Sequence, residues 1–155
     1  LCLGAVGTGK TYLATALGVK ACTQGKRVRF YRTIDLVTEL VEKHRTGHLG
    51  KTLEQLLKLD LLILDELGYI PIDKTSSQLL FHVISNSYQQ QSVIITSNSE
   101  FGRWNEIFRD DRLTAAIIDR LVHHAYILGF SGPSYRYREA IAARAESISQ
   151  TTQMD

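Results

Sequence analysis

A glycine-rich run at the start of the chain contains the residue types that bind phosphate groups. Its residues are Gly4, Ala5, Val6, Gly7, Thr8, Gly9, Lys10 and Thr11, and they match the pattern G-x-x-x-x-G-K-[ST] at every fixed position. In such a loop, backbone N–H groups turn towards one anion, and the following helix adds partial positive charge. The ammonium group of Lys10 would bridge the β- and γ-phosphates of a nucleotide, and the Thr11 hydroxyl group would be a ligand of Mg²⁺. The run therefore predicts a binding site for a nucleoside triphosphate with Mg²⁺.

Two adjacent carboxylates, Asp65 and Glu66, follow a continuous apolar run at residues 61–64. Such a run is typical of a parallel strand that is buried on both faces, and ligands bind at the carboxyl ends of such strands. Asp65 is suited to the Mg²⁺ shell, and Glu66 can reach the water that attacks the γ-phosphate, as a general base. Alone, the pair could equally cap a helix. Together with the phosphate loop it favours hydrolysis of the nucleotide.

A second apolar run, at residues 93–96, ends in the polar residues Ser97 and Asn98. If this strand lies between the strand before the phosphate loop and the strand before Asp65, the Asn98 amide can reach the attacking water or the γ-phosphate. The alternative is that Asn98 is only a turn residue, because Ser-Asn-Ser sequences favour turns.

Two arginine positions also allow either a functional or a structural interpretation. Arg120 lies beside the apolar stripe of a predicted helix, where a charged group needs a partner. It is either an arginine finger that enters the nucleotide site of a neighbouring subunit or part of an ion pair with Asp110 or Asp111. The basic and aromatic cluster at residues 134–138, which includes Arg136, could contact the phosphates of a nucleotide or of DNA, or form a surface edge.

The elements that position these residues alternate between strands and helices along the chain. Apolar residues predict strands at residues 1–3, 28–31, 61–64, 93–96 and 125–128, of which 1–3, 61–64 and 93–96 are expected to be buried. Thr33, Thr52 and Thr75 are expected to cap three of the helices between them. The alternation predicts an α/β fold in which a mostly parallel sheet is covered by helices on both faces.

Composition fits one domain and excludes some classes of protein. The 155 residues are 44% hydrophobic, which suffices for a real core, and the formal net charge of +2 neither requires nor excludes a nucleic-acid partner. No apolar run approaches the ~20 residues that span a bilayer, and no secretion signal precedes the phosphate loop. Two cysteines are too few for a disulfide framework. We therefore expect a cytoplasmic protein with no membrane partner.

Residues 1 to about 138 resemble the IstB-like ATPases, which are encoded beside the transposase in one class of bacterial insertion sequences. The similarity includes the phosphate loop, residues 65–69 and residues 94–98, and it continues through Phe101-x-x-Trp104-x-x-Ile107-Phe108-x-Asp110 and residues 113–116, 119–125 and 134–136. These proteins in turn resemble DnaC-type helicase loaders, and both groups belong to the AAA+ ATPases.

The resemblance implies a three-layer P-loop NTPase (AAA+) fold for residues 1–138, with a five-stranded parallel sheet in the order 5-1-4-3-2. Residues 139–155 lie outside the resemblance, and there we expect a frayed helix followed by a disordered tail. The resemblance further implies that ATP and Mg²⁺ are the cofactors. It makes Asn98 the first sensor residue, Arg120 the arginine finger and Arg136 a second sensor.

The same resemblance implies ATP-driven assembly of a homo-oligomer on duplex DNA and stimulation of a cognate transposase. The helix at residues 35–45 corresponds to an additional helix that faces DNA in the initiator and loader branch. Lys43 and Arg45, with Lys51 nearby, are therefore predicted DNA contacts, which would be sensitive to salt and independent of sequence. Family members also carry a helical segment ahead of the phosphate loop. We expect that segment to be missing here and the first strand to be truncated.

Two other hypotheses remain for the function. A DnaC-like helicase loader would use ATP as a switch for a protein interaction. A small-molecule P-loop kinase would need an arginine-rich lid and would not call for the Asp65–Glu66 pair. The runs around Trp104 and at residues 119–125 favour the transposition helper.

Overall fold

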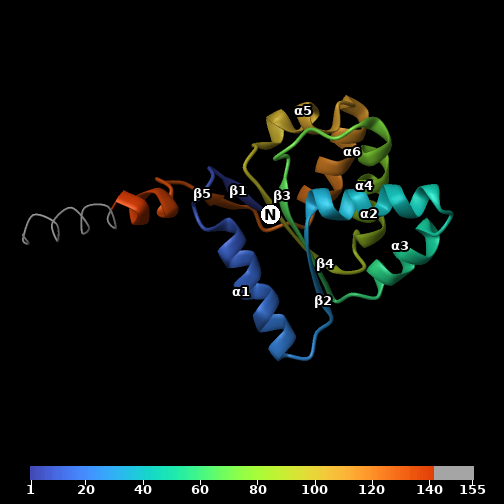
Figure 1. Ribbon diagram of the computed structural model, residues 1–155, viewed down its shortest axis with the longest axis horizontal. Coiled ribbons are helices and arrows are strands. Elements are labelled where there is room, and N and C mark those ends of the chain that lie inside the picture. Colours follow the sequence, from blue (N-terminus) through green and yellow to red (C-terminus); the bar gives the residue numbers. More distant parts are fainter. Residues whose placement is uncertain (142–155) are drawn as a thin grey trace, which may run out of the picture.

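Five parallel strands form a single sheet in the computed structural model, which describes residues 1–141 (Figure 1). The strands are β1 (Cys2–Gly4), β2 (Val28–Arg32), β3 (Leu61–Leu67), β4 (Ser92–Ser97) and β5 (Leu128–Phe130). Their order across the sheet is β2-β3-β4-β1-β5, and every neighbouring pair is parallel. This arrangement confirms the predicted order 5-1-4-3-2.

Helices cover both faces of the sheet, which confirms the predicted three layers. The helices are α1 (Lys10–Thr23), α2 (Thr33–Arg45), α3 (Leu49–Leu57), α4 (Lys74–Ser87), α5 (Trp104–Phe108) and α6 (Asp111–Val122), with a short 3₁₀ helix η1 (Phe101–Arg103). Residues 135–141 are also helical. Helix α1 lies apart from the group formed by α2 to α6, as Figure 1 shows. Among the described helices, none is both long and apolar enough to cross a membrane.

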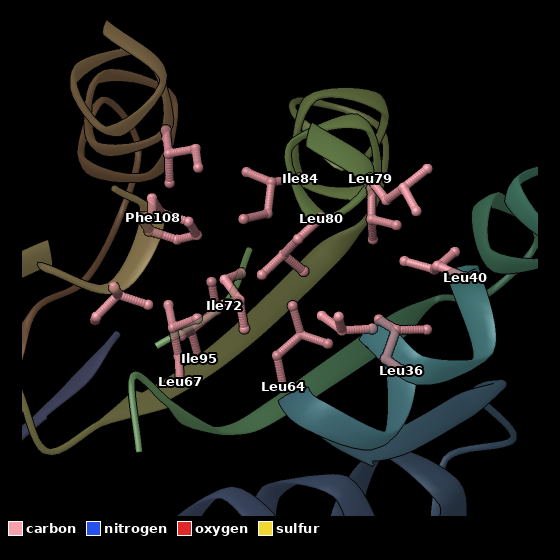
Figure 2. Close-up of a cluster of buried hydrophobic side chains, with 14 of the residues drawn as sticks. Leu36, Leu40, Leu64, Leu67, Ile72, Leu79, Leu80, Ile84, Ile95 and Phe108 are labelled. Atoms are coloured by element: carbon pink, nitrogen blue, oxygen red, sulfur yellow. The ribbon is translucent and has the colours of Figure 1, made fainter. Parts of the chain in front are cut away.

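Alternation along β3 divides the core between the two faces. Leu62 and Leu64 belong to the larger cluster, in which side chains of α2 and α4 also pack, whereas Ile63 packs with Ala14 of α1. Figure 2 shows the larger cluster, where side chains of both helices point towards the strands. Because β3 is buried on both faces, it reads in the sequence as an uninterrupted apolar run.

The three threonines expected to cap helices do not do so. Thr33 and Thr52 lie inside α2 and α3, and the hydroxyl group of Thr33 donates instead to the Asp65 carbonyl oxygen at 2.8 Å. For α4, the carboxylate of Asp73 accepts hydrogen bonds from the backbone N–H groups of Thr75 and Ser76. The Asp73 carboxylate therefore caps α4 in place of the Thr75 hydroxyl group, since Asp is at least as good an N-cap as Thr.

Two strand boundaries also differ from the prediction. The last strand was expected at residues 125–128, but β5 begins at Leu128, after an irregular segment. Strand β3 was expected to end before Asp65 and instead continues to Leu67, so the carboxylate pair lies within its last residues. The predicted tail at residues 139–155 falls largely on residues 142–155, which lie outside the described part of the chain.

We expect truncation of a core leucine of α4 to destabilise this fold far more than truncation of an exposed one. Leu80 is completely buried, whereas Leu17 of α1 is 44% exposed. Leu80→Ala should lower the free energy of unfolding by about 2–5 kcal/mol, and Leu17→Ala by less than about 1 kcal/mol. Urea unfolding followed by the fluorescence of the single tryptophan, Trp104, measures both changes. Equal losses in the two variants would contradict the assignment of this core.

Candidate functional site

A pocket of about 1000 Å³ lies where the phosphate loop, the ends of β3 and β4 and residues 131–138 meet. The predicted site residues that line it are Val6, Gly7, Thr8, Gly9, Lys10, Thr11, Asp65, Glu66, Asn98 and Arg136. Gly4 and Ala5 lie at the base of the loop, outside the lining. The lining also excludes Arg120, Lys43, Arg45 and Lys51. The structure thus brings the phosphate-loop, carboxylate, asparagine and second-sensor candidates into one place.

The phosphate loop connects β1 to α1 through backbone conformations that favour glycine. Gly7 and Gly9 have φ angles of 79° and 99°, in the left-handed region. Gly9 is also the N-cap residue of α1, so the loop runs directly into the helix N-terminus. This is the strand–loop–helix arrangement in which backbone N–H groups and the helix dipole bind an anion.

The side chain of Lys10 folds back over the loop from the first turn of α1. Its Nζ atom donates hydrogen bonds to the carbonyl oxygens of Gly4 at 2.7 Å and Ala5 at 2.6 Å, and the residue is buried. Burial lowers the pKa of the Lys10 ammonium group, and the nearby Asp65 carboxylate opposes this shift. A positive charge held against the loop in this way can form charge-assisted hydrogen bonds to phosphate oxygens.

Thr11 and Asp65 meet across the pocket although they are 54 residues apart in the chain. The Thr11 hydroxyl group donates to both carboxylate oxygens of Asp65, at 3.0 and 3.1 Å, and Asp65 is buried. A hydroxyl group and a carboxylate side by side are oxygen ligands of the kind that Mg²⁺ prefers. The donor set therefore fits a Mg²⁺ ion, which Thr11 and Asp65 would hold.

Glu66 lines the same pocket as Asp65, which neighbouring residues of a regular strand do not do, because their side chains point to opposite faces. The register between β3 and β4 explains the exception. Leu64 pairs with Ile95 and Leu67 pairs with Ser97, so β3 has one extra residue in this interval, which is a β-bulge. Glu66 takes a left-handed φ of 59° and is exposed. The bulge thus allows both carboxylates to reach one site.

Asn98 directly follows β4, and β4 lies between β1 and β3. The condition set from the sequence is therefore met, and the Asn98 side chain lines the pocket. The turn interpretation also has support, because the Ser97 hydroxyl group accepts a hydrogen bond from the Ser99 N–H group at 3.1 Å. The turn and the position at the pocket are compatible.

The start of the helix at residues 135–141 docks on the phosphate loop. The N–H group of Tyr135 donates to the carbonyl oxygen of Gly7 at 2.9 Å. A Cβ atom on Gly7 would lie 2.1 Å from the Ser134 hydroxyl oxygen, so only glycine fits beneath this contact. The contact brings Arg136 and Arg138 to the pocket wall. The sequence gives no sign of it beyond the basic and aromatic character of the cluster.

Arg120 lies away from this pocket, on α6. Its guanidinium group stacks over the Phe81 ring at 4.9 Å from the ring centre and donates to the Ala116 carbonyl oxygen at 3.1 Å. The ion pair with Asp110 or Asp111 is absent from the described residues. A rise of about 1.5 Å per residue along a helix puts Asp111 about 14 Å from Arg120, too far for an ion pair.

The predicted DNA contacts lie around the junction of α2 and α3. Lys43 and Arg45 are in the last turn of α2, and Lys51 is in the first turn of α3. Arg45 and Lys51 are exposed, and the Arg45 guanidinium group forms an ion pair with Glu42 at 2.8 Å. None of these three residues lines the pocket that contains the phosphate loop.

The pocket wall also contains Thr96 of β4, Arg32 of β2 and Tyr12 of α1, which are not among the site residues predicted from the sequence. Thr96 stands in an apolar run and looks like an ordinary strand residue. Arg32 ends an edge strand that carries no motif. Tyr12 follows the phosphate loop directly, and this position next to the motif is the one feature of the sequence that could have indicated its place in the pocket wall.

Two of the solved structures that resemble the chain are replication proteins. AMPPCP-bound DnaA from Aquifex aeolicus superposes with a TM-score of 0.71 at 22% identity, covering 94% of this chain and 44% of that one. The DnaC helicase loader superposes with a TM-score of 0.70 at 24% identity, covering 84% and 76%. At these identities the likeness shows the fold alone, which is that of an AAA+ P-loop domain.

Similarity in sequence shows the family of the chain in addition to its fold. A family model described as IstB-like ATP binding protein matches residues 1–143. An insertion sequence ATP-binding protein of Sinorhizobium fredii is 44% identical over 144 residues, which are 93% of this chain and 48% of that protein. The ATP-binding protein of insertion sequence IS21 from Pseudomonas aeruginosa is 43% identical over 137 residues, covering 88% and 52%. The chain spans about half the length of these curated relatives. With a match of this extent, the chain belongs to the IstB-like family of ATP-binding proteins, whose curated relatives come from insertion sequences.

Proposed function

We propose that this protein is a Mg²⁺-dependent ATPase that assembles on duplex DNA in the cytoplasm and assists the transposase of an insertion sequence. The observation that carries the proposal is the convergence of Lys10, Thr11, Asp65 and Glu66 on one pocket. Family membership supports ATP as the nucleotide and an insertion sequence as the setting.

The phosphate loop would bind the nucleotide through its backbone N–H groups and through Lys10. The Lys10 ammonium group would exchange its bonds to two loop carbonyls for bonds to phosphate oxygens, which are charged and therefore stronger acceptors. Thr11 and Asp65 would hold Mg²⁺, which neutralises phosphate charge when it is bound. Arg136, which also lines the pocket, would contact the phosphates.

Glu66 would act on the attacking water. It is exposed and lines the pocket, whereas Asp65 is buried and bonded to Thr11. These different surroundings divide the roles, because a general base must reach water and a metal ligand must be fixed. Asn98 would orient the same water or the γ-phosphate from the end of the adjacent strand.

Arg120 would complete the pocket of a neighbouring subunit. It does not line its own pocket, and its resting contacts with Phe81 and Ala116 are intrachain. Supply of the finger by another subunit would make hydrolysis depend on assembly. Lys43, Arg45 and Lys51 would bind DNA phosphates, so salt would weaken assembly on DNA.

Loss of the loop lysine should abolish nucleotide binding. Lys10→Ala removes the charge at the centre of the loop, and we expect the affinity for a fluorescent ATP analogue to fall by at least about 100-fold. Lys20→Ala is the matched control, because Lys20 lies on the same helix and is exposed. Normal affinity in folded Lys10→Ala protein would contradict the assignment of the phosphate loop.

Neutralising Glu66 should stop turnover without preventing binding. We expect Glu66→Gln to bind ATP normally and to hydrolyse it about 100- to 10 000-fold more slowly. Phosphate release would be measured without DNA, with single-stranded DNA and with long duplex. Stimulation of the unmodified protein by duplex would support the transposition helper. Stimulation by single strands or a helicase alone would favour a DnaC-like loader instead, and turnover in the variant would exclude Glu66 as the base.

The finger predicts complementation between two inactive variants. We expect Arg120→Ala to bind ATP and to lose about 1000-fold or more in turnover, whereas Arg112→Ala on the same helix keeps it. Mixing with Glu66→Gln subunits should restore phosphate release, because some interfaces then pair an intact Glu66 with an intact Arg120. Mixtures that stay inactive would indicate an intrachain role for Arg120 at Phe81.

A further inference from the structure

One residue of β4, Thr96, stands opposite the bulge that carries both carboxylates. Ile95 pairs with Leu64 and Ser97 pairs with Leu67, so Thr96 is the single β4 residue that faces Asp65 and Glu66. A bulge leaves its extra residue without a regular ladder partner. The backbone N–H group of Glu66 therefore has no regular ladder acceptor on β4.

The hydroxyl group of Thr96 supplies an acceptor and makes a second bond at the same time. It accepts a hydrogen bond from the Glu66 N–H group at 2.9 Å and donates one to the Oδ1 atom of Asp65 at 2.5 Å. Thr96 is 1% exposed, so water does not compete for either bond. One buried hydroxyl group thus contacts the Asp65 side chain and the backbone of Glu66.

We propose that Thr96 is a positioning residue of the nucleotide site, whose hydroxyl group fixes the Asp65 carboxylate and holds the bulged Glu66 in its left-handed conformation. This inference rests on the proposed function, because it assigns Thr96 a role through the two carboxylates of that site. Thr96 itself forms part of the pocket wall, but its hydroxyl group is committed to Asp65 and Glu66.

The two hydrogen bonds of Thr96 affect different steps, which are the binding of Mg²⁺ and the placement of the general base. The bond to Oδ1 leaves the Asp65 carboxylate with a fixed orientation towards the Thr11 hydroxyl group, which contacts both of its oxygens. The bond from the Glu66 N–H group offsets part of the strain that a left-handed backbone imposes on a residue with a Cβ atom. Loss of the hydroxyl group should therefore weaken the response to Mg²⁺ and, separately, misplace the general base.

Replacement of Thr96 by valine tests this proposal, since valine has nearly the same shape and lacks the hydroxyl group. Thr96→Ser keeps the hydroxyl group and should restore function. Thr114→Val is the matched control, because Thr114 is also buried and its hydroxyl group donates to the Asp110 carbonyl oxygen, away from the pocket. All variants would first be compared with the unmodified protein by thermal unfolding.

Three readouts separate positioning from a merely structural role. The first is the Mg²⁺ concentration that gives half-maximal binding of ATP, which we expect Thr96→Val to raise about 10- to 100-fold, as is usual when a residue that orients a metal ligand is lost. The second is kcat for ATP, which should fall by a similar factor while binding without Mg²⁺ is unchanged. The third is hydrogen exchange at the Glu66 amide, which should be slow in the unmodified protein and fast in Thr96→Val.

The outcomes are distinct. The proposal is overturned if Thr96→Val keeps normal Mg²⁺ dependence and normal exchange at Glu66, or if Thr96→Ser is impaired as strongly as Thr96→Val. If Thr96→Val does not fold, Thr96→Ala removes the same hydroxyl group, and slow exchange at Glu66 in Thr96→Ser still tests the bond. If the unmodified protein binds Mg²⁺ and ATP but hydrolyses nothing under any condition, the proposed ATPase function fails. The Mg²⁺ and exchange readouts still decide the role of Thr96 in that case.

Discussion

The candidate site depends on one constraint, which is that parallel strands deliver their carboxyl ends to the same edge of a sheet. Strands β1, β4 and β3 are adjacent in that order. The phosphate loop follows the first, Asn98 follows the second, and the third carries Asp65 and Glu66 in its last residues. Residues from distant parts of the chain therefore meet without any dedicated structure beyond the sheet itself. The crossover helices needed to keep the strands parallel also bury both faces of β3.

Much of this arrangement could be predicted from the sequence because its signals are local and physical. The phosphate loop is a contiguous motif, and the apolar runs of β3 and β4 mark strands buried on both sides. The strand order is not contained in such patterns, and it came from the resemblance to a known family. The positions of Lys10, Thr11 and Asp65 then follow, since Lys10 and Thr11 belong to the motif and Asp65 lies near the end of a strand.

The parts that sequence analysis missed depend on the pairing of distant segments. The bulge in β3 arises from its register with β4, and register is a property of two strands. The same is true of the Thr96 bonds and of the docking of Tyr135 on Gly7. At the start of α4, the sequence offers two residues that can cap the helix, and the Asp73 carboxylate caps it in place of Thr75. The alternative ion pair of Arg120 with Asp110 or Asp111 does not form for a simpler reason. Both aspartates lie at the start of α6, whereas Arg120 lies in its last turn.

The bulge has a consequence for how this domain can vary. Side chains at positions 62, 64 and 67 enter the same core cluster, although a regular strand would place 62, 64 and 66 on that face. Leu67 reaches the core because Asp65 and Glu66 together take the place of one residue of a regular strand. Deletion of Glu66 would remove the carboxylate and the bulge, and Leu67 would then occupy the regular strand position that faces the core. The acid at this position can therefore be lost by deletion as well as by exchange of the side chain, while Leu67 keeps its place in the hydrophobic core. The additional residue thus supplies chemistry on which the packing of the core does not depend.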